Sequence, residues 1–88
     1  MDNRKYEVFL SIAETNNITE TAEQLGYSQS GVTQMIKSME QELGVPLLIR
    51  TNKGTHLSGA GRELLPLMRE SVRWEEKIRQ KCAQLTGT

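Results

Sequence analysis

Residues 29–43 form the most regular amphipathic segment of the chain. Its apolar residues recur at spacings of four, three and four, which places them on one side of a helix. They are Val32, Ile36, Met39 and Leu43. The opposite side carries small or hydrogen-bonding residues, namely Ser30, Thr33, Gln34, Lys37 and Gln41. Ser28 is suited to cap the start, and Gly44 followed by Pro46 ends the segment. The pattern predicts a helix over about 29–43 with one buried and one exposed polar side.

A second, shorter helix is expected just before it. Thr19 is its predicted N-cap, Glu20 lies in its first turn, and Ala22 and Leu25 form its apolar side. Gly26 stands where a left-handed residue commonly ends a helix. Only Gly26-Tyr27 separates this helix from the cap of the next one, so the two are predicted to form a helix-turn-helix.

An additional helix is expected over about residues 3–15, ending at Asn16-Asn17. Its apolar stripe is predicted to consist of Tyr6, Phe9, Leu10 and Ala13. The residues turned away from the core are then Glu7, Ser11 and Glu14.

Two short segments compatible with β-structure follow the helix-turn-helix. Residues 47–49 and 55–57 are joined by Thr51-Asn52-Lys53-Gly54, whose Asn and Gly tolerate positive φ. Residues 52–62 contain Lys53, His56 and Arg62 and no acidic residue. The sequence therefore predicts a small hairpin with a basic tip, placed as a wing beside the helix-turn-helix.

The last helix is predicted from about Gly59 to Leu85, capped by Ser58, with a bend rather than a break at Pro66. Spacings of four and three indicate an imperfect heptad seam. Its members are Leu64, Met68, Ser71, Glu75, Ile78, Cys82 and Leu85, with Leu67 and Trp74 beside them. A helix this long projects beyond a three-helix core, so its distal apolar residues are expected to pair with a second chain. The alternative is that Trp74 folds back on its own domain. Cys82 is expected to be a small buried apolar residue rather than a redox sensor.

Composition excludes several classes of protein. The chain has 88 residues, enough for one domain, and its 11 basic residues balance its 11 acidic ones. Residues 1–27 are acidic overall, whereas residues 28–62 are slightly basic. One cysteine and one histidine make neither an internal disulfide nor a structural zinc site, so we expect no metal and no cofactor. No segment is long and apolar enough to span a membrane, and no nucleophile elbow or phosphate loop indicates an enzyme.

The polar side of residues 29–43 has the chemistry that duplex recognition requires. A helix fits the major groove only where its outward side chains are short or can hydrogen-bond at base edges. Four residues meet this requirement: Gln29, Ser30, Thr33 and Gln34. The acids Glu40 and Glu42 are held back at the other end of the helix. The alternative is an ordinary amphipathic helix with a solvated polar side. In the wing, Lys53 is expected to contact phosphates or the minor groove, and Arg50 either DNA or the helix carbonyls.

Over nearly all of residues 5–66 the sequence resembles the N-terminal DNA-binding domain of LysR-type transcriptional regulators. The matching positions follow in order: Phe9 and Ala13, Asn17-Ile18-Thr19, Ala22 and Leu25, Ser28-Gln29, Val32-Thr33-Gln34, Ile36, Met39-Glu40, Glu42-Leu43-Gly44-Val45, Leu47, Arg50-Thr51, Leu57-Ser58, and Ala60-Gly61. Three positions depart from the usual pattern: Ser30 replaces a proline, Gly31 a small alanine or serine, and Leu48 a frequent phenylalanine. The first two leave the start of the reading helix less stable and its base preference open.

The resemblance implies a mainly α winged helix-turn-helix, with a three-helix core and a hairpin wing over residues 1–58. A long linker and dimerisation helix follows over residues 59–88. It implies a cytoplasmic protein that binds specific sequences of double-stranded DNA as a homodimer. A full-length protein could also assemble as a tetramer. The resemblance implies that Gln29, Ser30, Thr33 and Gln34 read the bases. Contacts to the DNA backbone or minor groove fall to Thr19, Ser28, Lys37, Arg50, Thr51, Asn52, Lys53 and His56.

The resemblance also implies a C-terminal domain that binds a small-molecule effector. Because the chain stops at Thr88, near where that domain would begin, we expect it to be the DNA-binding part of a longer protein. The competing interpretation is a winged-helix module that binds another protein, which the zero net charge favours.

Overall fold

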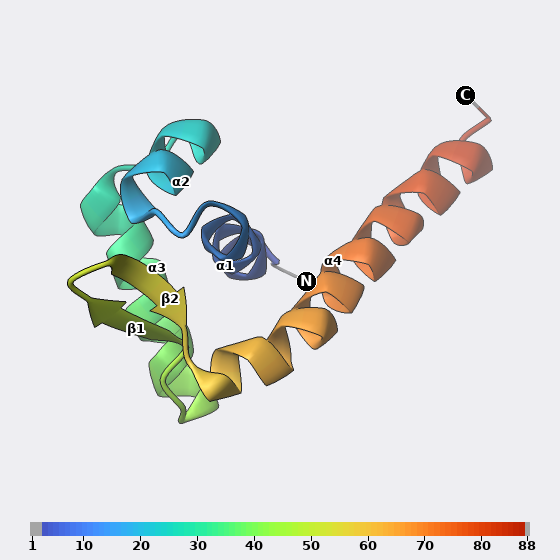
Figure 1. Ribbon diagram of the computed structural model, residues 1–88. Coiled ribbons are helices and arrows are strands. Elements are labelled where there is room, and N and C mark those ends of the chain that lie inside the picture. The colour runs from blue at the N-terminus through green and yellow to red at the C-terminus, as the bar shows by residue number, and fades with distance from the viewer. Residues whose placement is uncertain (1–2, 88) are drawn as a thin grey trace.

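Capping residues fix the helix boundaries in the computed structural model, which describes residues 3–87. The chain forms α1 (Arg4–Thr15), α2 (Ile18–Leu25), α3 (Gln29–Leu43), β1 (Leu48–Thr51), β2 (Gly54–Leu57) and α4 (Gly59–Leu85). Ser28 and Ser58 cap α3 and α4, as predicted, by accepting hydrogen bonds from the backbone N–H of Gly31 and Gly61. Gly26 and Gly44 end α2 and α3 in the left-handed conformation. The predicted mainly α winged helix-turn-helix is confirmed (Figure 1).

The cap of α2 differs from the prediction. Thr19 lies inside the helix, and the N-cap is Asn17, whose Oδ1 accepts a hydrogen bond from the Glu20 N–H at 2.9 Å. Asn17 has extended backbone dihedrals, as an N-cap requires, and Asn16 before it closes α1 in the left-handed conformation. Helix α1 therefore ends where it was predicted to end, whereas the cap of α2 lies two residues earlier than predicted.

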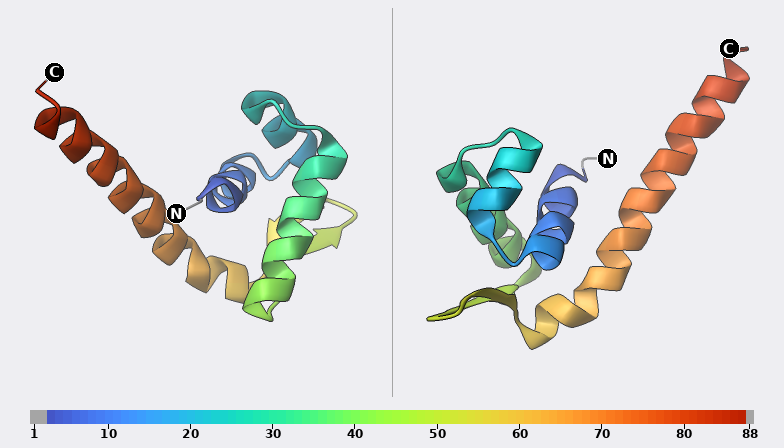
Figure 2. Two further views of the ribbon diagram at one scale, coloured as in Figure 1. Left: turned by 180° about the vertical axis from the view of Figure 1, so that it is seen from behind. Right: turned by 45° about the horizontal axis from the view of Figure 1, so that its top comes forward.

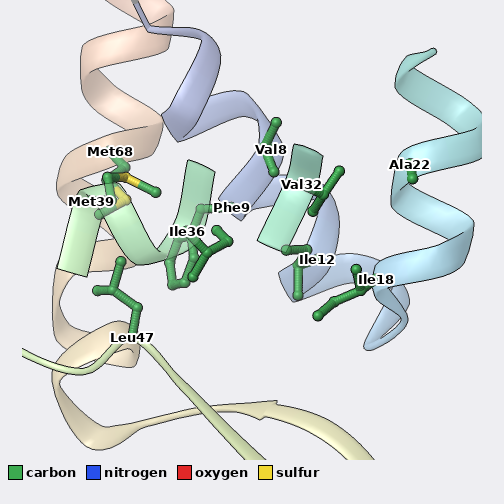
Figure 3. Packing of buried hydrophobic residues seen from close by; sticks show 10 residues of the cluster. All are labelled: Val8, Phe9, Ile12, Ile18, Ala22, Val32, Ile36, Met39, Leu47 and Met68. Carbon is green, nitrogen blue, oxygen red and sulfur yellow. The ribbon is translucent and has the colours of Figure 1, made fainter. Parts of the chain in front are cut away.

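The core lies where α1, α2 and α3 meet the beginning of β1 and one side of α4 (Figure 3). Its ten apolar members are Val8, Phe9, Ile12, Ile18, Ala22, Val32, Ile36, Met39, Leu47 and Met68. The stripe predicted for α3 is confirmed at Val32, Ile36 and Met39, but Leu43 is 40% exposed. Leu43 is the last residue of α3 and borders a surface hollow together with Lys5 and Tyr6 of α1.

The side of α1 that the structure buries differs from the predicted apolar side. Only Phe9 of that stripe is buried, and the other buried residues are Val8 and Ile12, while Leu10 is half-buried. The physical reason is that α1 packs against α2, α3 and α4 at once, so that a different arc of the helix is enclosed. Leu25 of α2, predicted to be buried, is 41% exposed because it ends its helix.

The hairpin is tied to the end of α3 by one carboxylate. Strands β1 and β2 pair antiparallel from Leu48 with Leu57 to Thr51 with Gly54, leaving Asn52-Lys53 as the turn. Glu40 Oε2 accepts hydrogen bonds from the backbone N–H groups of Leu47 at 2.7 Å and Leu48 at 3.4 Å. The wing therefore has a fixed position relative to α3.

Helix α4 runs unbroken through Pro66, and its axis bends in its first turns (Figure 2). Gly61 and Met68 are buried against the domain, whereas every residue from Glu76 to Gly87 is exposed. The molecule is accordingly elongated, with extents of 52 × 25 × 20 Å. No helix within residues 3–87 has the length and apolar character needed to cross a membrane.

The residues of the predicted heptad seam on α4 fall into two groups, one packed against the chain's own domain and one exposed. Met68, expected at the dimer contact, is only 4% exposed and belongs to the core of its own chain. Leu64 packs against that core, and Ser71 hydrogen-bonds to Asn3. The predicted seam is wrong at Met68, because Met68 is buried in the core of its own chain, whereas the dimer contact of the half-buried Leu64 and Ser71 stays a prediction. Trp74 is 56% exposed, so the alternative in which it folds back on its domain is also wrong.

Candidate nucleic-acid interface

The polar side of α3 faces away from the core and is not covered by α4. Gln29, Ser30, Gln34 and Lys37 are exposed, and Thr33 is half-buried. Helix α1 lies between α4 and the pair formed by α2 and α3 (Figure 1). Since Val32, Ile36 and Met39 anchor the opposite side of α3, the exposed groups project from a rigid support.

The beginning of α3 is held by its serine cap. Ser28 Oγ accepts a hydrogen bond from the Gly31 N–H at 3.0 Å and lies 3.3 Å from the Ser30 hydroxyl. A Cβ at position 31 would lie 2.9 Å from that same capping oxygen. Glycine at this position therefore leaves room for the cap, which compensates for its low helix propensity.

Predicted site residues from three elements gather around one hollow of about 290 Å³. Thr19 comes from the first turn of α2, Gln29 from the first turn of α3, and Arg50 and Thr51 from β1. Asn17, which the prediction of the site omitted, also lines it. The signal for Asn17 was its spacing from Glu20, since an N-cap is commonly followed three residues later by Glu or Gln.

Arg50 also borders a second hollow, of about 260 Å³, between β1 and α3. Thr33 and Lys37 of α3 line this hollow. Glu40 also lines the second hollow. Arg50 is exposed and thus borders both the start and the middle of the polar side of α3. Together with the N-terminus of α2, where backbone N–H groups carry partial positive charge, it creates a region suited to anionic oxygens.

The wing tip extends this region with further donors. Asn52 and Lys53 form the exposed turn, and Thr51 Oγ accepts a hydrogen bond from the Lys53 N–H at 3.2 Å. His56 lies on β2 opposite Ile49 and is half-buried. No acidic residue occurs between Glu42 and Glu63, so the wing surface is basic although the chain is neutral.

The distal half of α4 carries an exposed apolar row. Its members are Trp74, Ile78, Cys82 and Leu85, and Leu67 is a further exposed apolar residue in the proximal half of α4, seven residues before Trp74. Cys82 is exposed, so the prediction that it is a buried residue is wrong. The exposed fractions of Leu67 and Leu85 reach 65% and 78%. Lys77 Nζ lies 4.5 Å from the centre of the Trp74 ring, a cation–π contact at the edge of the row. Contiguous apolar surface of this kind marks a site of association.

Within residues 3–87, histidine, cysteine and carboxylate side chains do not gather in a group of three or more that could hold a metal ion. The groups that the fold brings together are instead hydrogen-bond donors, acceptors and cations. This chemistry fits recognition of a polar, anionic surface.

Comparison with known proteins agrees with this geometry. The family described as "Bacterial regulatory helix-turn-helix protein, lysR family" matches residues 3–62. The HTH-type transcriptional regulator IlvR of Caulobacter vibrioides is 38% identical over 72 residues, which are 82% of this chain and 24% of IlvR. The HTH-type transcriptional regulator CzcR of Bacillus subtilis is 36% identical over 80 residues, 91% of this chain and 28% of CzcR. The chain thus spans about a quarter of the length of these relatives.

Solved structures give the same result. The complex of the CbnR DNA-binding domain with DNA superposes with a TM-score of 0.89 at 28% identity, covering 98% of this chain and 99% of that one. CbnR is a LysR family transcriptional regulator. Because the family match covers more than half of the sequence and the fold agrees over nearly all of it, the chain belongs to the lysR family of bacterial regulatory helix-turn-helix proteins and carries their winged helix-turn-helix DNA-binding domain.

Proposed function

We propose that this chain binds specific sequences of double-stranded DNA as part of a cytoplasmic LysR-type transcriptional regulator, with α3 in the major groove. The observation that carries the proposal is the exposed row of short hydrogen-bonding side chains on α3, continuous with the basic wing. The structure of the related CbnR domain in complex with DNA supports it. The relatives are transcriptional regulators, and we propose no catalytic activity for this chain.

Base reading is assigned to four residues of α3: Gln29, Ser30, Thr33 and Gln34. A glutamine amide can donate to N7 and accept from N6 of adenine at once, so Gln29 and Gln34 supply most of the discrimination. The hydroxyls of Ser30 and Thr33 serve bases or phosphates. Thr33 is recessed relative to its neighbours, which suits contact with a group that projects from the base edge, such as a thymine methyl.

Contacts to the DNA backbone and minor groove are assigned to the rim around α3. The residues are Thr19, Ser28, Lys37, Arg50, Thr51, Asn52, Lys53 and His56. Arg50 borders both hollows beside α3 and is placed to hold a phosphate next to the N-terminus of α2. Lys53 at the exposed wing tip supplies charge without sequence information.

Substituting Gln29 or Gln34 with alanine is expected to weaken a specific duplex by about 5- to 150-fold, the value of a lost bidentate base contact of ~1–3 kcal/mol. Random-sequence DNA should be bound almost as before. Lys53→Ala should weaken both duplexes alike and reduce the slope of log affinity against log salt by about 1. Competition binding on a duplex selected from a random pool and on its scrambled version, at several salt concentrations, measures both effects.

Matched control variants are Gln24→Ala and Gln41→Ala, which remove exposed glutamines from α2 and from the last turns of α3. Equal losses on both duplexes for Gln29→Ala and Gln34→Ala would contradict base reading. If the chain bound no duplex at low salt while remaining dimeric, the alternative of a protein-interaction module would replace the DNA-binding proposal.

We further propose that two copies associate through the exposed apolar row of α4. The row lies on the part of the helix that leaves its own domain, where its side chains are exposed. A dimer would present two recognition helices to successive major grooves, with half-sites about one helical turn (~34 Å) or a multiple of it apart.

Ile78→Glu is expected to weaken association by more than about tenfold, because it places an unpaired carboxylate in the apolar row. Gln80→Glu adds the same charge two residues later, on the opposite side of the helix, and should leave association nearly unchanged. Sedimentation equilibrium of both variants over a range of concentrations measures the effect. Equal dissociation constants for the two variants would place the contact elsewhere.

A further inference from the structure

An asparagine at the start of α1 does not cap its own helix. Asn3 is the N-cap residue, and its carbonyl accepts the first helical hydrogen bond from the Glu7 N–H at 2.9 Å. Its side chain makes no capping hydrogen bond, although asparagine is among the best capping residues. The side chain is directed to another element instead.

That element is the middle of α4, 68 positions later in the sequence. Asn3 Nδ2 donates to the backbone carbonyl of Ser71 at 3.1 Å, and the Ser71 hydroxyl donates to Asn3 Oδ1, also at 3.1 Å. Asn3 is only 5% exposed. A serine within a helix ordinarily donates its hydroxyl to a carbonyl of the preceding turn. Asn3 and Ser71 therefore each make a long-range hydrogen bond in place of the local one that is usual for their position.

The pair of Asn3 and Ser71 lies near the last turn of α4 that packs against the domain. Met68 anchors the helix one turn earlier by apolar packing, which is non-directional and permits sliding or tilting. Ser71, Val72 and Glu75 are the last partly buried residues, and everything from Glu76 to Gly87 is exposed. The pair therefore lies at the point where α4 leaves the domain and begins to carry the apolar row.

We infer that Asn3 and Ser71 are positioning residues that fix the angle and register at which α4 leaves the DNA-binding domain. The two hydrogen bonds are directional, and a shift of one helical turn would remove the Ser71 hydroxyl from Asn3 and leave the buried Asn3 Oδ1 without its donor, which is unfavourable. Because we propose that α4 joins two copies, the same pair sets the distance between their recognition helices. This consequence rests on the proposed function, and it makes Asn3 and Ser71 determinants of half-site spacing without touching DNA.

The first experiment measures the angle of α4 without DNA. Spin labels are placed on the full chain at Glu23→Cys in α2 and Gln84→Cys in α4, with Cys82→Ser, and diluted with unlabelled chain so that only intrachain distances are recorded. The parent should give one narrow distribution, and Asn3→Ala and Ser71→Ala should broaden or shift it. Because the two residues act as one contact, the double variant should behave like either single variant. A distribution unchanged in all three variants would overturn the inference.

The second experiment measures affinity for operators whose half-site spacing is changed in steps of one base pair. The parent should bind one spacing more tightly than the others. In Asn3→Ala, the ratio of the affinity for the best spacing to the affinity for neighbouring spacings should approach one. The affinity for a single half-site should be preserved. The matched control is Ser11→Ala, which removes a hydroxyl bonded to Thr21 at 3.1 Å within the domain but not at α4. A spacing preference retained in Asn3→Ala, or lost equally in Ser11→Ala, would contradict the role in spacing. Absence of DNA binding by the parent would instead overturn the proposed function and leave the distance measurement decisive for the angle.

Discussion

Gly61→Ala is expected to lower the free energy of unfolding by about 3 kcal/mol, at the upper end of the usual cost of overpacking. A methyl group at position 61 would collide with the backbone carbonyl oxygen of Leu47 and lie 3.2 Å from Phe9 Cζ. Neither neighbour can move easily, because Phe9 is fully buried and the Leu47 carbonyl accepts a hydrogen bond from the Ser58 N–H at 2.9 Å. Urea denaturation followed by circular dichroism measures the loss.

The matched control is Gly59→Ala, two residues earlier in the same turn of α4, where a Cβ would meet nothing within 4 Å. This variant should be neutral or more stable by up to about 1 kcal/mol, because alanine has the higher helix propensity. A Gly61→Ala chain as stable as the Gly59→Ala chain would show that α4 does not pack against Leu47 as closely as described.

Phe9→Ala is expected to lower the free energy of unfolding by about 3–5 kcal/mol, a large part of the ~5–15 kcal/mol by which a typical domain is stable. Phe9 of α1 is fully buried in the core, where its ring faces the start of α4 at Gly61, so its removal leaves a cavity among the core residues (Figure 3). Thermal and urea unfolding should show a much less stable or partly unfolded chain. Leu10→Ala, at the next and only half-buried position, should cost clearly less. Similar losses for the two variants would contradict the orientation of α1.

The contrast between Phe9 and Leu10 shows which part of the fold is encoded locally. Apolar residues occur on several sides of α1, including Val8, Leu10 and Ile12, so periodicity identifies a helix but not the arc that faces the core. The arc is selected by the three helices that surround α1. By contrast, α3 has one apolar stripe and one polar side, and its bounds and its orientation could both be predicted from the sequence.

The heptad spacing of α4 was ambiguous for a related reason. A partner chain and the chain's own α1 offer the same kind of apolar surface, so spacing alone cannot assign Met68 to one or the other. The structure assigns it to the domain. The pair Asn3–Ser71 could not be predicted at all, because hydrogen bonds between positions 68 apart leave no local pattern.

For the candidate site, residue types were sufficient to predict the exposed side of α3 and the basic wing, but not their mutual arrangement. Thr19, Gln29 and Arg50 come together around one hollow only because the hairpin returns along α3. Asn17 was missed because Asn17 and Thr19, two residues apart, each suited the capping role, and backbone geometry decides between such candidates.

The carboxylate of Glu40, bonded to the first backbone N–H groups of the wing, has a consequence for the thermodynamics of recognition. It makes the recognition helix and the wing a single preorganised body before they meet a ligand. Association then loses little conformational entropy in the protein, and its heat-capacity change reflects desolvation of preformed surfaces rather than coupled folding. In the proposed complex, the duplex then undergoes most of the conformational adjustment, and its sequence-dependent deformability contributes to specificity.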